Sequence, residues 1–218
     1  MSPSMRFPKH IFLIVFSVLL LLPHRVSAHP HMFLDAAVTV RANERGVTGV
    51  LVEWEFDVWF SASILMDFDF DNNKKFDDYE TSEIYDLAFS NLINYNYFTY
   101  FTVDDEMIPA SEVTEFSVRA EKDKIVYTFF IPFSVPFEQG AAEFSVAVYD
   151  KTFFCDVAYV ESETARFEGP GNMEMDYTIG VDKGITIEYD NAIVGNGRSG
   201  EVYTGVSHPD SIRVVLKK

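Results

Sequence analysis

The chain has 218 residues, of which 48% are hydrophobic and 16% are aromatic. So much apolar surface offsets the entropy of ordering the backbone, and the composition therefore excludes an intrinsically disordered protein. Acidic residues outnumber basic ones by 34 to 17, and the resulting charge of −17 repels phosphate backbones, so we expect no nucleic-acid binding.

Residues 1–28 have the organisation of a secretory signal peptide. Two basic residues precede an uncharged run at residues 11–22, and Val26-Ser27-Ala28 has the small residues of a cleavage site. At about 1.5 Å per residue the run is shorter than a hydrocarbon core of about 30 Å, which disfavours the alternative of an uncleaved membrane anchor. We expect an exported mature chain that begins at His29, is periplasmic or secreted, and is not membrane-embedded.

Most of the mature chain has the pattern of β-strands. Between residues 50 and 58, apolar side chains alternate with mostly acidic ones, and this period of two is typical of a half-buried strand. Strands spaced by roughly 8–12 residues indicate a mainly β fold, either an antiparallel sandwich or a partly open barrel. The expected strands are residues 32–41, 50–58, 97–104, 112–121, 124–131, 143–149, 153–161, 164–168, 174–179 and 184–190.

The expected domain organisation is a single β-rich domain at residues 29–190 with a helical insert at residues 59–96. In the insert, apolar residues recur at three- and four-residue steps on both sides of an acidic loop, which predicts an inserted EF-hand-like helix–loop–helix. Residues 191–218 are richer in glycine and serine. We expect them to form a loosely ordered C-terminal tail with one short strand near residues 212–216.

The loop at residues 69–80 carries oxygen donors in the order of a calcium-binding EF-hand loop. Such a loop supplies ligands from positions 1, 3, 5, 7, 9 and 12. Those positions hold Asp69, Asp71, Asn73, the Lys75 carbonyl, Asp77 and Glu80. We expect calcium rather than magnesium, because this number of oxygen ligands suits the larger ion. A single loop of this kind is expected to stiffen the structure rather than to sense a signal.

One position of the loop departs from the pattern. Lys74 stands at position 6, where glycine is usual because the backbone turns with positive φ. A lysine adopts this conformation at a cost of about 1 kcal/mol, and the charges of Lys74 and Lys75 also weaken cation binding. The alternative interpretation is a solvated acidic turn between two helices. Phe76 at position 8 has the apolar character of a loop residue that packs inward.

The new N-terminus is a second candidate metal site. His29 offers its α-amine and its ring to one metal, and His31, two residues further on, shares the same face of a strand. Imidazole suits zinc, nickel, cobalt and copper, whereas Pro30 excludes the terminal motif that uses backbone amides, because it has no N–H. The alternative is a flexible end without an ion. Candidate carboxylate ligands are Asp35, which lies on the face of His31, and Glu53, Glu55 or Asp57 on the neighbouring strand.

Other features are expected to be structural. Cys155 cannot form an internal disulfide in a chain with one cysteine, and its apolar strand-like surroundings predict burial. His208 is expected to be a surface residue. The sequence has no Gly-rich phosphate loop, nucleophile elbow or His-x-x-x-His helix, so we expect no enzymatic activity.

Several segments together resemble one family, the exported bacterial proteins of domain of unknown function 1007. The resemblance covers about residues 29–170 and rests on HPHMFLD (29–35), VEWEFDVWFS (52–61), the acidic loop (67–80), NYNYFT (94–99) and VYDKTFF (148–154). The family is labelled a periplasmic component of an uncharacterised ABC-type transport system. Its association with nickel, cobalt or zinc transporters implies metal handling, here by the histidine leader and the loop. The family's loop commonly has glycine where this chain has Lys74, and proline is common where it has Lys151.

Three hypotheses for function follow from the sequence. The first is a periplasmic metal-binding accessory protein, with calcium in the loop, that hands a divalent transition metal to an inner-membrane transporter. The second is a calcium-stabilised structural or protein-interaction module with no transport role. The third is a secreted copper redox enzyme that uses the N-terminal histidine.

Overall fold

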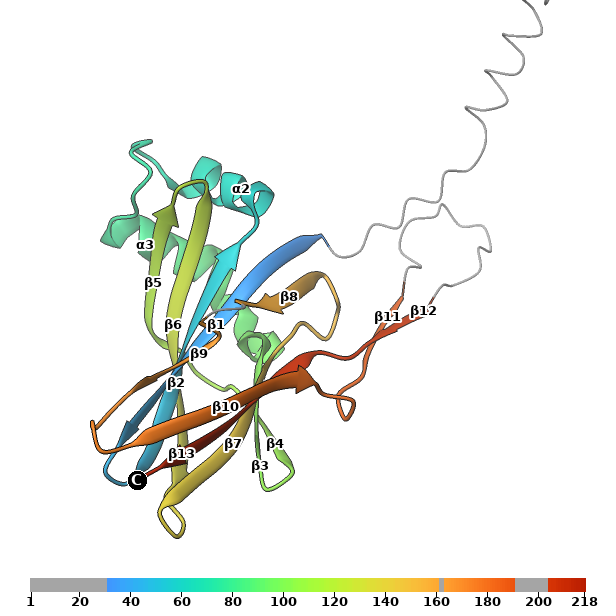
Figure 1. The fold of residues 1–218 in the computed structure, drawn as a ribbon. Helices are drawn as coiled ribbons and strands as arrows, with labels where there is room; N and C mark the ends of the chain where they lie inside the picture. Colours follow the sequence, from blue (N-terminus) through green and yellow to red (C-terminus); the bar gives the residue numbers. More distant parts are fainter. Residues whose placement is uncertain (1–30, 161–162, 191–203) are drawn as a thin grey trace, which may run out of the picture.

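The computed structural model describes residues 31–160, 163–190 and 204–218. The predicted signal peptide and His29 lie outside these residues. Strands dominate the described part, as predicted, and a short helical segment follows the second strand (Figure 1). None of the helices in this part is long and apolar enough to cross a membrane. The strands are β1 (Met32–Asn43), β2 (Gly46–Phe56), β3 (Thr99–Val103), β4 (Glu106–Pro109), β5 (Thr114–Glu121), β6 (Lys124–Pro136), β7 (Ala141–Val148), β8 (Cys155–Tyr159), β9 (Ala165–Glu168), β10 (Glu174–Val181), β11 (Ile187–Asp190), β12 (Thr204–Ser207) and β13 (Asp210–Lys217).

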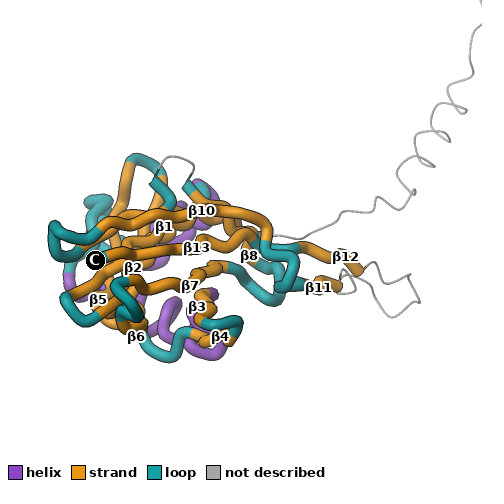
Figure 2. The backbone as a smooth tube through the Cα atoms, turned by 60° about the horizontal axis from the view of Figure 1, so that its bottom comes forward, coloured by secondary structure: helices purple, strands orange, loops and turns teal. Residues whose placement is uncertain are grey.

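The strands form two main sheets that share one core. Sheet A has the order β5-β6-β2-β1-β8, with β9 also paired to β1, and sheet B has the order β10-β13-β7-β3-β4. The ring of Phe101 from sheet B stacks on Phe133 from sheet A, with centroids 4.0 Å apart. Both sheets are open, so the described strands form no closed barrel. The β11–β12 ribbon projects away from both sheets (Figure 2).

One edge of sheet A departs from the predicted antiparallel arrangement. β8 runs parallel to the first part of β1, and β9 runs parallel to its second part, whereas β2 pairs with β1 antiparallel. Two strands joined by a tight hairpin must be antiparallel, but β8 follows β7 of the other sheet, so no hairpin fixes its direction. The sequence pattern marks strands but not this crossing between sheets.

The predicted alternation in β2 is confirmed. Val50, Val52, Trp54 and Phe56 are buried, while the side chains between them are only partly buried and point away from the core. Trp54 lies at the centre of an aromatic cluster, with ring centroids 4.7 Å from Phe129 and 5.6 Å from Phe98. Burying rings of this size supplies much of the free energy that holds the layers together.

The helical segment covers the end of sheet A that sheet B does not reach (Figure 1). It consists of α2 (Val58–Phe68), α3 (Asp78–Ile84), a π-helical turn η1 (Tyr85–Phe89) and a 3₁₀ segment η2 (Ser90–Phe98). Ile64, Ile84 and Phe89 belong to the same buried cluster as Trp54. The second predicted helix therefore exists only as far as residue 84 in regular α form. Beyond Phe89 the backbone tightens, and it leaves helical geometry at Tyr95.

The short strand expected near residues 212–216 is confirmed as β13, which is longer than predicted, but the described C-terminal residues are otherwise more ordered than the loose tail expected for residues 191–218. β13 lies between β10 and β7 in the middle of sheet B, and its apolar residues Ile212, Val214 and Leu216 are fully buried. The composition of residues 191–200, which lie outside the described part, dominated that expectation. The alternation of three apolar residues marked the strand correctly, since a strand needs only a few residues of period two.

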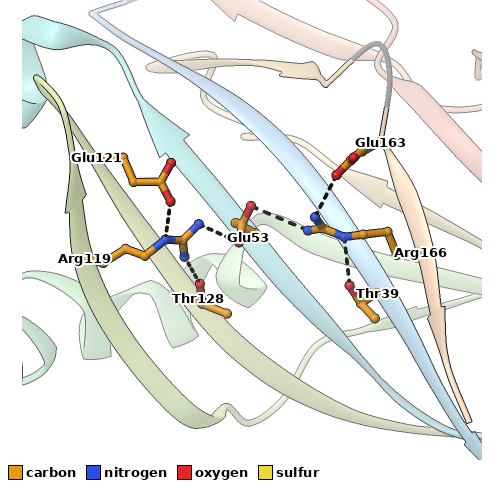
Figure 3. Close-up of polar contacts among 7 residues, drawn as sticks. All are labelled: Thr39, Glu53, Arg119, Glu121, Thr128, Glu163 and Arg166. Atoms are coloured by element: carbon orange, nitrogen blue, oxygen red, sulfur yellow. Dashed lines mark hydrogen bonds and ion pairs between the residues drawn. The ribbon is translucent and has the colours of Figure 1, made fainter.

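The outer face of sheet A carries a ladder of opposite charges (Figure 3). Glu53 of β2 lies between Arg119 of β5 and Arg166 of β9, with nitrogen–oxygen distances of 2.9 and 3.6 Å. Each arginine also pairs with a second glutamate, Glu121 or Glu163. Exposed pairs of this kind contribute little stability individually, but they hold the Glu53 carboxylate on the outer face.

Candidate metal-binding loop

The loop of residues 69–77 is held at both ends by helix termini. Asp69 is the C-cap residue of α2, and its backbone N–H donates to the Leu65 carbonyl at 3.1 Å. Asp77 is the N-cap residue of α3, and its Oδ1 accepts from the Glu80 N–H at 2.9 Å. Aspartate is favoured at the N-cap because its oxygen satisfies an unpaired helix N–H. The first and ninth loop positions are therefore fixed by helix capping.

Glu80 closes the loop from the first turn of α3. Its Oε2 accepts from the Asp77 N–H at 3.1 Å, which completes a capping box. Its Oε1 accepts from the Phe70 N–H at 2.8 Å, ten residues earlier in the chain. The side chain is only 4% exposed. The last predicted ligand thus reaches across the loop to its first residues.

Asp69 is the hub of the loop's first half. Its two carboxylate oxygens accept from the N–H groups of Asn73 and Lys74, each at 3.0 Å. The chain curls around this carboxylate because Asn72 and Lys74 adopt positive φ values of 58° and 59°. The predicted left-handed turn at Lys74 is confirmed. Phe76 packs against the core cluster, also as predicted.

Three carboxylates converge in this loop. Asp69, Asp71 and Glu80 each present an oxygen within 4.8 Å of the others, the only such cluster of three or more ligand-type side chains in the part of the chain that the structure describes. Two oxygens bound to one calcium, at 2.3–2.6 Å each, lie at most about 5 Å apart. The spacing therefore suits a shared cation.

Burial makes the need for a counter-charge greater. Asp69 is 7% exposed, and among the described residues no lysine or arginine forms an ion pair with Asp69, Asp71 or Glu80. The buried oxygens are satisfied by backbone N–H groups alone. Removing a carboxylate from water is costly unless positive charge compensates it, and three of them close together repel one another.

The remaining predicted ligands do not join this cluster. Asp77 is used as a helix cap, and Asn73 donates its amide nitrogen to Asp71 at 2.6 Å while its oxygen accepts from the Lys75 N–H at 2.6 Å. The Asn73 oxygen reaches an ion only if the amide rotates. The Lys75 carbonyl as a ligand stays a prediction. Three of the five predicted side-chain donors are thus brought together.

The structure describes only part of the N-terminal candidate site. His29 lies outside the described residues. His31 is exposed at the start of β1, where its backbone N–H donates to the Phe154 carbonyl at 2.9 Å and its ring lies 4.9 Å from the Phe154 ring. Asp35 is four strand residues further on, about 13 Å along β1, and it lies 3.8 Å from Lys124 instead. The structure therefore does not bring Asp35 to His31.

The other carboxylates proposed for that site have different partners. Glu53 belongs to the charge ladder, and Glu55 pairs with Lys124. Asp57 is the N-cap residue of α2, and its Oδ2 accepts from the Phe33 N–H at 2.9 Å. Partial burial alone raises the pKa of Asp57, but the N–H groups of Phe33 and of the first helical turn outweigh it and lower the pKa below its usual value.

Cys155 and His208 have structural surroundings. Cys155 is buried, as predicted, and burial raises the pKa of its thiol well above the ordinary value. His208 has a ring nitrogen 2.7 Å from the Ile185 carbonyl. Neither residue lies in a cluster of metal-ligating side chains among those that the structure describes.

Two features escaped the sequence analysis. The buried Asp150 carboxylate accepts from the N–H groups of Thr152, Phe154 and Cys155, and so it shapes the turn against which His31 lies. A shallow hollow of about 360 Å³ also borders the loop, lined by Asp71, Asp77 and Glu80 and by two exposed aromatic side chains. In the sequence, the hollow is indicated by aromatic residues next to the loop carboxylates. A search that considers only the spacing of metal ligands does not detect this pattern.

Comparison with known proteins supports a family assignment. The family model described as "Protein of unknown function (DUF1007)" matches residues 14–181. An "Uncharacterized 15.5 kDa protein in trpE 3'region" of Spirochaeta aurantia is 30% identical over 99 residues, which cover 45% of this chain and 70% of that protein. An "Uncharacterized protein" of Haemophilus influenzae is 24% identical over 144 residues, covering 65% of this chain and 68% of its own length.

Proposed function

The chain belongs to the DUF1007 family, and we propose that it is an exported cation-binding accessory protein rather than an enzyme. In this proposal α2, the loop and α3 form an EF-hand-like unit that holds one calcium ion. The observation that carries the proposal is the convergence of Asp69, Asp71 and Glu80 within 4.8 Å. These three residues occupy positions 1, 3 and 12 of the loop pattern, which are carboxylate positions in calcium loops.

The donor set favours calcium over magnesium. Calcium accepts six to eight oxygens in a flexible cage, whereas magnesium requires near-ideal octahedral geometry and keeps several waters. The loop offers three converged carboxylates, and Asn73, the Lys75 carbonyl and Asp77 lie between the second and the third of them in the sequence. The positive charges of Lys74 and Lys75 and the backbone cost at Lys74 weaken the affinity. Weak binding is sufficient in a compartment where calcium is plentiful.

The role of this ion is structural. It would neutralise the buried carboxylates of Asp69 and Glu80 and thereby tie the end of α2 to the start of α3. Free energy gained by binding only the folded chain adds to stability. The insert packs on the aromatic cluster around Trp54, so stiffening the loop also protects the core beneath it.

A second candidate function is delivery of a transition metal to an inner-membrane transporter. One observation favours it: His31, two residues after the predicted mature terminus, is held directly before β1 by the hydrogen bond from its backbone N–H to the Phe154 carbonyl. A free α-amine and the rings of His29 and His31 would then supply up to three nitrogen ligands for zinc, nickel, cobalt or copper. Asp35 takes no part in this revised site. The role in transport rests on the family resemblance alone.

Metal analysis of the exported protein, purified with its native N-terminus, tests both parts. Stoichiometric calcium together with a transition metal is the expected result. Calcium alone supports the structural module without a transport role. If neither ion is retained after equilibration with each in turn, both sites are rejected. Mass spectrometry of the same sample fixes the terminal residue, on which the second site depends.

A further inference from the structure

α2 has apolar side chains on both of its sides. Ser61 and Ile64 face the core, whereas Trp59 is 84% exposed and Met66 is 79% exposed. Trp59 and Met66 are seven residues apart, so they lie on one face of the helix, within about 20° of each other. Tryptophan is rarely so exposed, and large apolar residues gathered on one surface indicate an interaction site.

The apolar surface continues into the loop. Phe70 follows the end of α2 and is 54% exposed, and Tyr79 in the first turn of α3 is 62% exposed. Their rings lie 5.8 Å apart and border the hollow that Asp71 and Asp77 also line. We call Trp59, Met66, Phe70 and Tyr79 the outer insert surface.

The charge around this surface has one dominant sign. Between residues 57 and 89 the chain has nine acidic and two basic residues. Several of these acidic residues are exposed, namely Asp67, Asp71, Asp77, Asp78 and Asp86, and two of them, Asp71 and Asp77, line the hollow with Phe70 and Tyr79. Apolar anchors framed by carboxylates are complementary to an amphipathic segment whose apolar side chains are flanked by lysine or arginine. An aromatic ring beside a carboxylate also suits a lysine or arginine head group.

We propose that the outer insert surface docks a basic amphipathic helix of a partner protein. Trp59 and Met66 would contact its apolar face, and the hollow lined by Phe70, Tyr79 and the loop carboxylates would receive a basic side chain. A second copy of this chain is disfavoured because it would bring two acidic inserts together. An anionic lipid surface is disfavoured for the same reason. This inference goes beyond the proposed ion binding. Its anchors Trp59 and Met66 lie outside the loop, whereas the hollow is lined by Asp71 and Glu80 of the proposed calcium site, so a bound calcium ion would compete there with a basic side chain.

The test uses the mature chain and a synthetic helical peptide of leucine and lysine in an amphipathic pattern. Of the two tryptophans in the chain, Trp54 is buried and Trp59 is exposed, so a change in fluorescence on binding reports on Trp59. We expect saturable binding that weakens with added salt. The same peptide with glutamate in place of lysine should bind at least about tenfold more weakly. Equal binding of the two peptides would overturn the proposal.

Substitutions locate the binding surface. Trp59→Ser and Met66→Ser should each weaken the binding of a labelled lysine peptide by about tenfold or more, measured by anisotropy, because a buried anchor of this size contributes on that scale. Val181→Ser is the matched control, since this valine of β10 is 59% exposed but lies in sheet B; it should change affinity less than about twofold. An equal loss with Val181→Ser contradicts the assignment, and thermal unfolding confirms that each variant is folded.

Two further outcomes separate this partner from the other occupants. If sedimentation shows a dimer of the chain that Trp59→Ser abolishes, the surface is a self-association interface and the proposal is wrong. If vesicles of phosphatidylglycerol bind the chain and Trp59→Ser prevents it while the peptide does not bind, the surface is a membrane contact. The peptide titration is repeated with calcium and with a chelator. Peptide binding that persists in the chelator supports docking whether or not the loop binds calcium, so the two proposals can fail separately.

Discussion

Replacing Glu80 with glutamine removes one carboxylate from the loop while keeping the shape of the side chain. Glutamine also serves at the third position of a capping box, so the bond to the Asp77 N–H can persist. In the absence of calcium we expect a modest loss of stability. The glutamine NH2 cannot accept the hydrogen bond from the Phe70 N–H, so this charge-assisted bond is lost at a cost of about 1–3 kcal/mol, which is partly offset because the repulsion among three carboxylates within 4.8 Å is relieved.

The expected effect appears when calcium is added. A ligand at 100 times its dissociation constant stabilises the folded state by about 2.7 kcal/mol, which for a chain of this size raises Tm by roughly 5–11 °C. If Glu80→Gln weakens binding by about a hundredfold, the same calcium concentration adds only about 0.4 kcal/mol, or roughly 1 °C. Differential scanning calorimetry of both proteins with calcium and with a chelator measures the two shifts.

Glu83→Gln is the matched control. It makes the same chemical change on the same helix, at a residue outside the carboxylate cluster, and it should retain the full calcium shift. The reasoning fails if wild type shows no shift, or if Glu80→Gln shifts as much as wild type. It also fails if Glu83→Gln loses the shift equally, because the effect would then report net charge and not ligation.

Three further predictions concern other parts of the molecule. Asp57→Ala should lower the free energy of unfolding by about 1 kcal/mol at neutral pH, the usual value of an N-cap. Because folding lowers the pKa of Asp57, this stabilisation is complete above the unfolded-chain pKa of about 3.9 and is lost as pH falls below it. Urea unfolding of both proteins should therefore show the difference at pH 7 and no difference near pH 2. Leu216→Ala in β13 should lower the free energy of unfolding by about 2–5 kcal/mol, since the side chain is fully buried. Val206→Ala, at an exposed position, should lower it by less than about 1 kcal/mol in the same urea titration. A similarly small effect of Leu216→Ala would mean that the C-terminal residues are loosely ordered. One extra residue before His29 should weaken transition-metal binding by at least about tenfold, because it removes the α-amine chelate, and metal should also leave the native terminus as pH falls through about 6.5; calorimetric titration that finds unchanged affinity would exclude the chelate, and the calcium shift should be unaffected.

The strands and the loop were predictable because each depends on nearby residues. The alternation in β2 is a local pattern, and the structure follows it. The donor register from Asp69 to Glu80 is also local, and the structure brings three of its carboxylates together. The parallel strands β8 and β9 were not predictable, because the choice of neighbour is made across more than a hundred residues of sequence. Secondary structure follows local periodicity, whereas sheet order follows from how whole layers pack.

The carboxylates of the N-terminal site show the same limit at the level of single side chains. The sequence analysis grouped Asp35 with His31 because both residues lie on one face of a strand. A shared face does not mean a short distance, because four residues span about 13 Å along a strand. Lys124 reaches Asp35 and Glu55 from the neighbouring β6 instead. In a chain with 34 acidic and 17 basic residues, a basic side chain placed by tertiary structure decides which carboxylates remain for a cation.

The two candidate ion sites are separated by one helix. At the first end of α2, Asp57 exchanges hydrogen bonds with Phe33, two residues after His31. At the other end, Asp69 is the first candidate ligand of the loop. A helix of 11 residues is about 16 Å long, several times the span of one coordination shell, so one ion cannot occupy both sites. Their ligands are therefore independent, while α2 mechanically joins the strand that follows the histidine leader to the loop that calcium would stiffen.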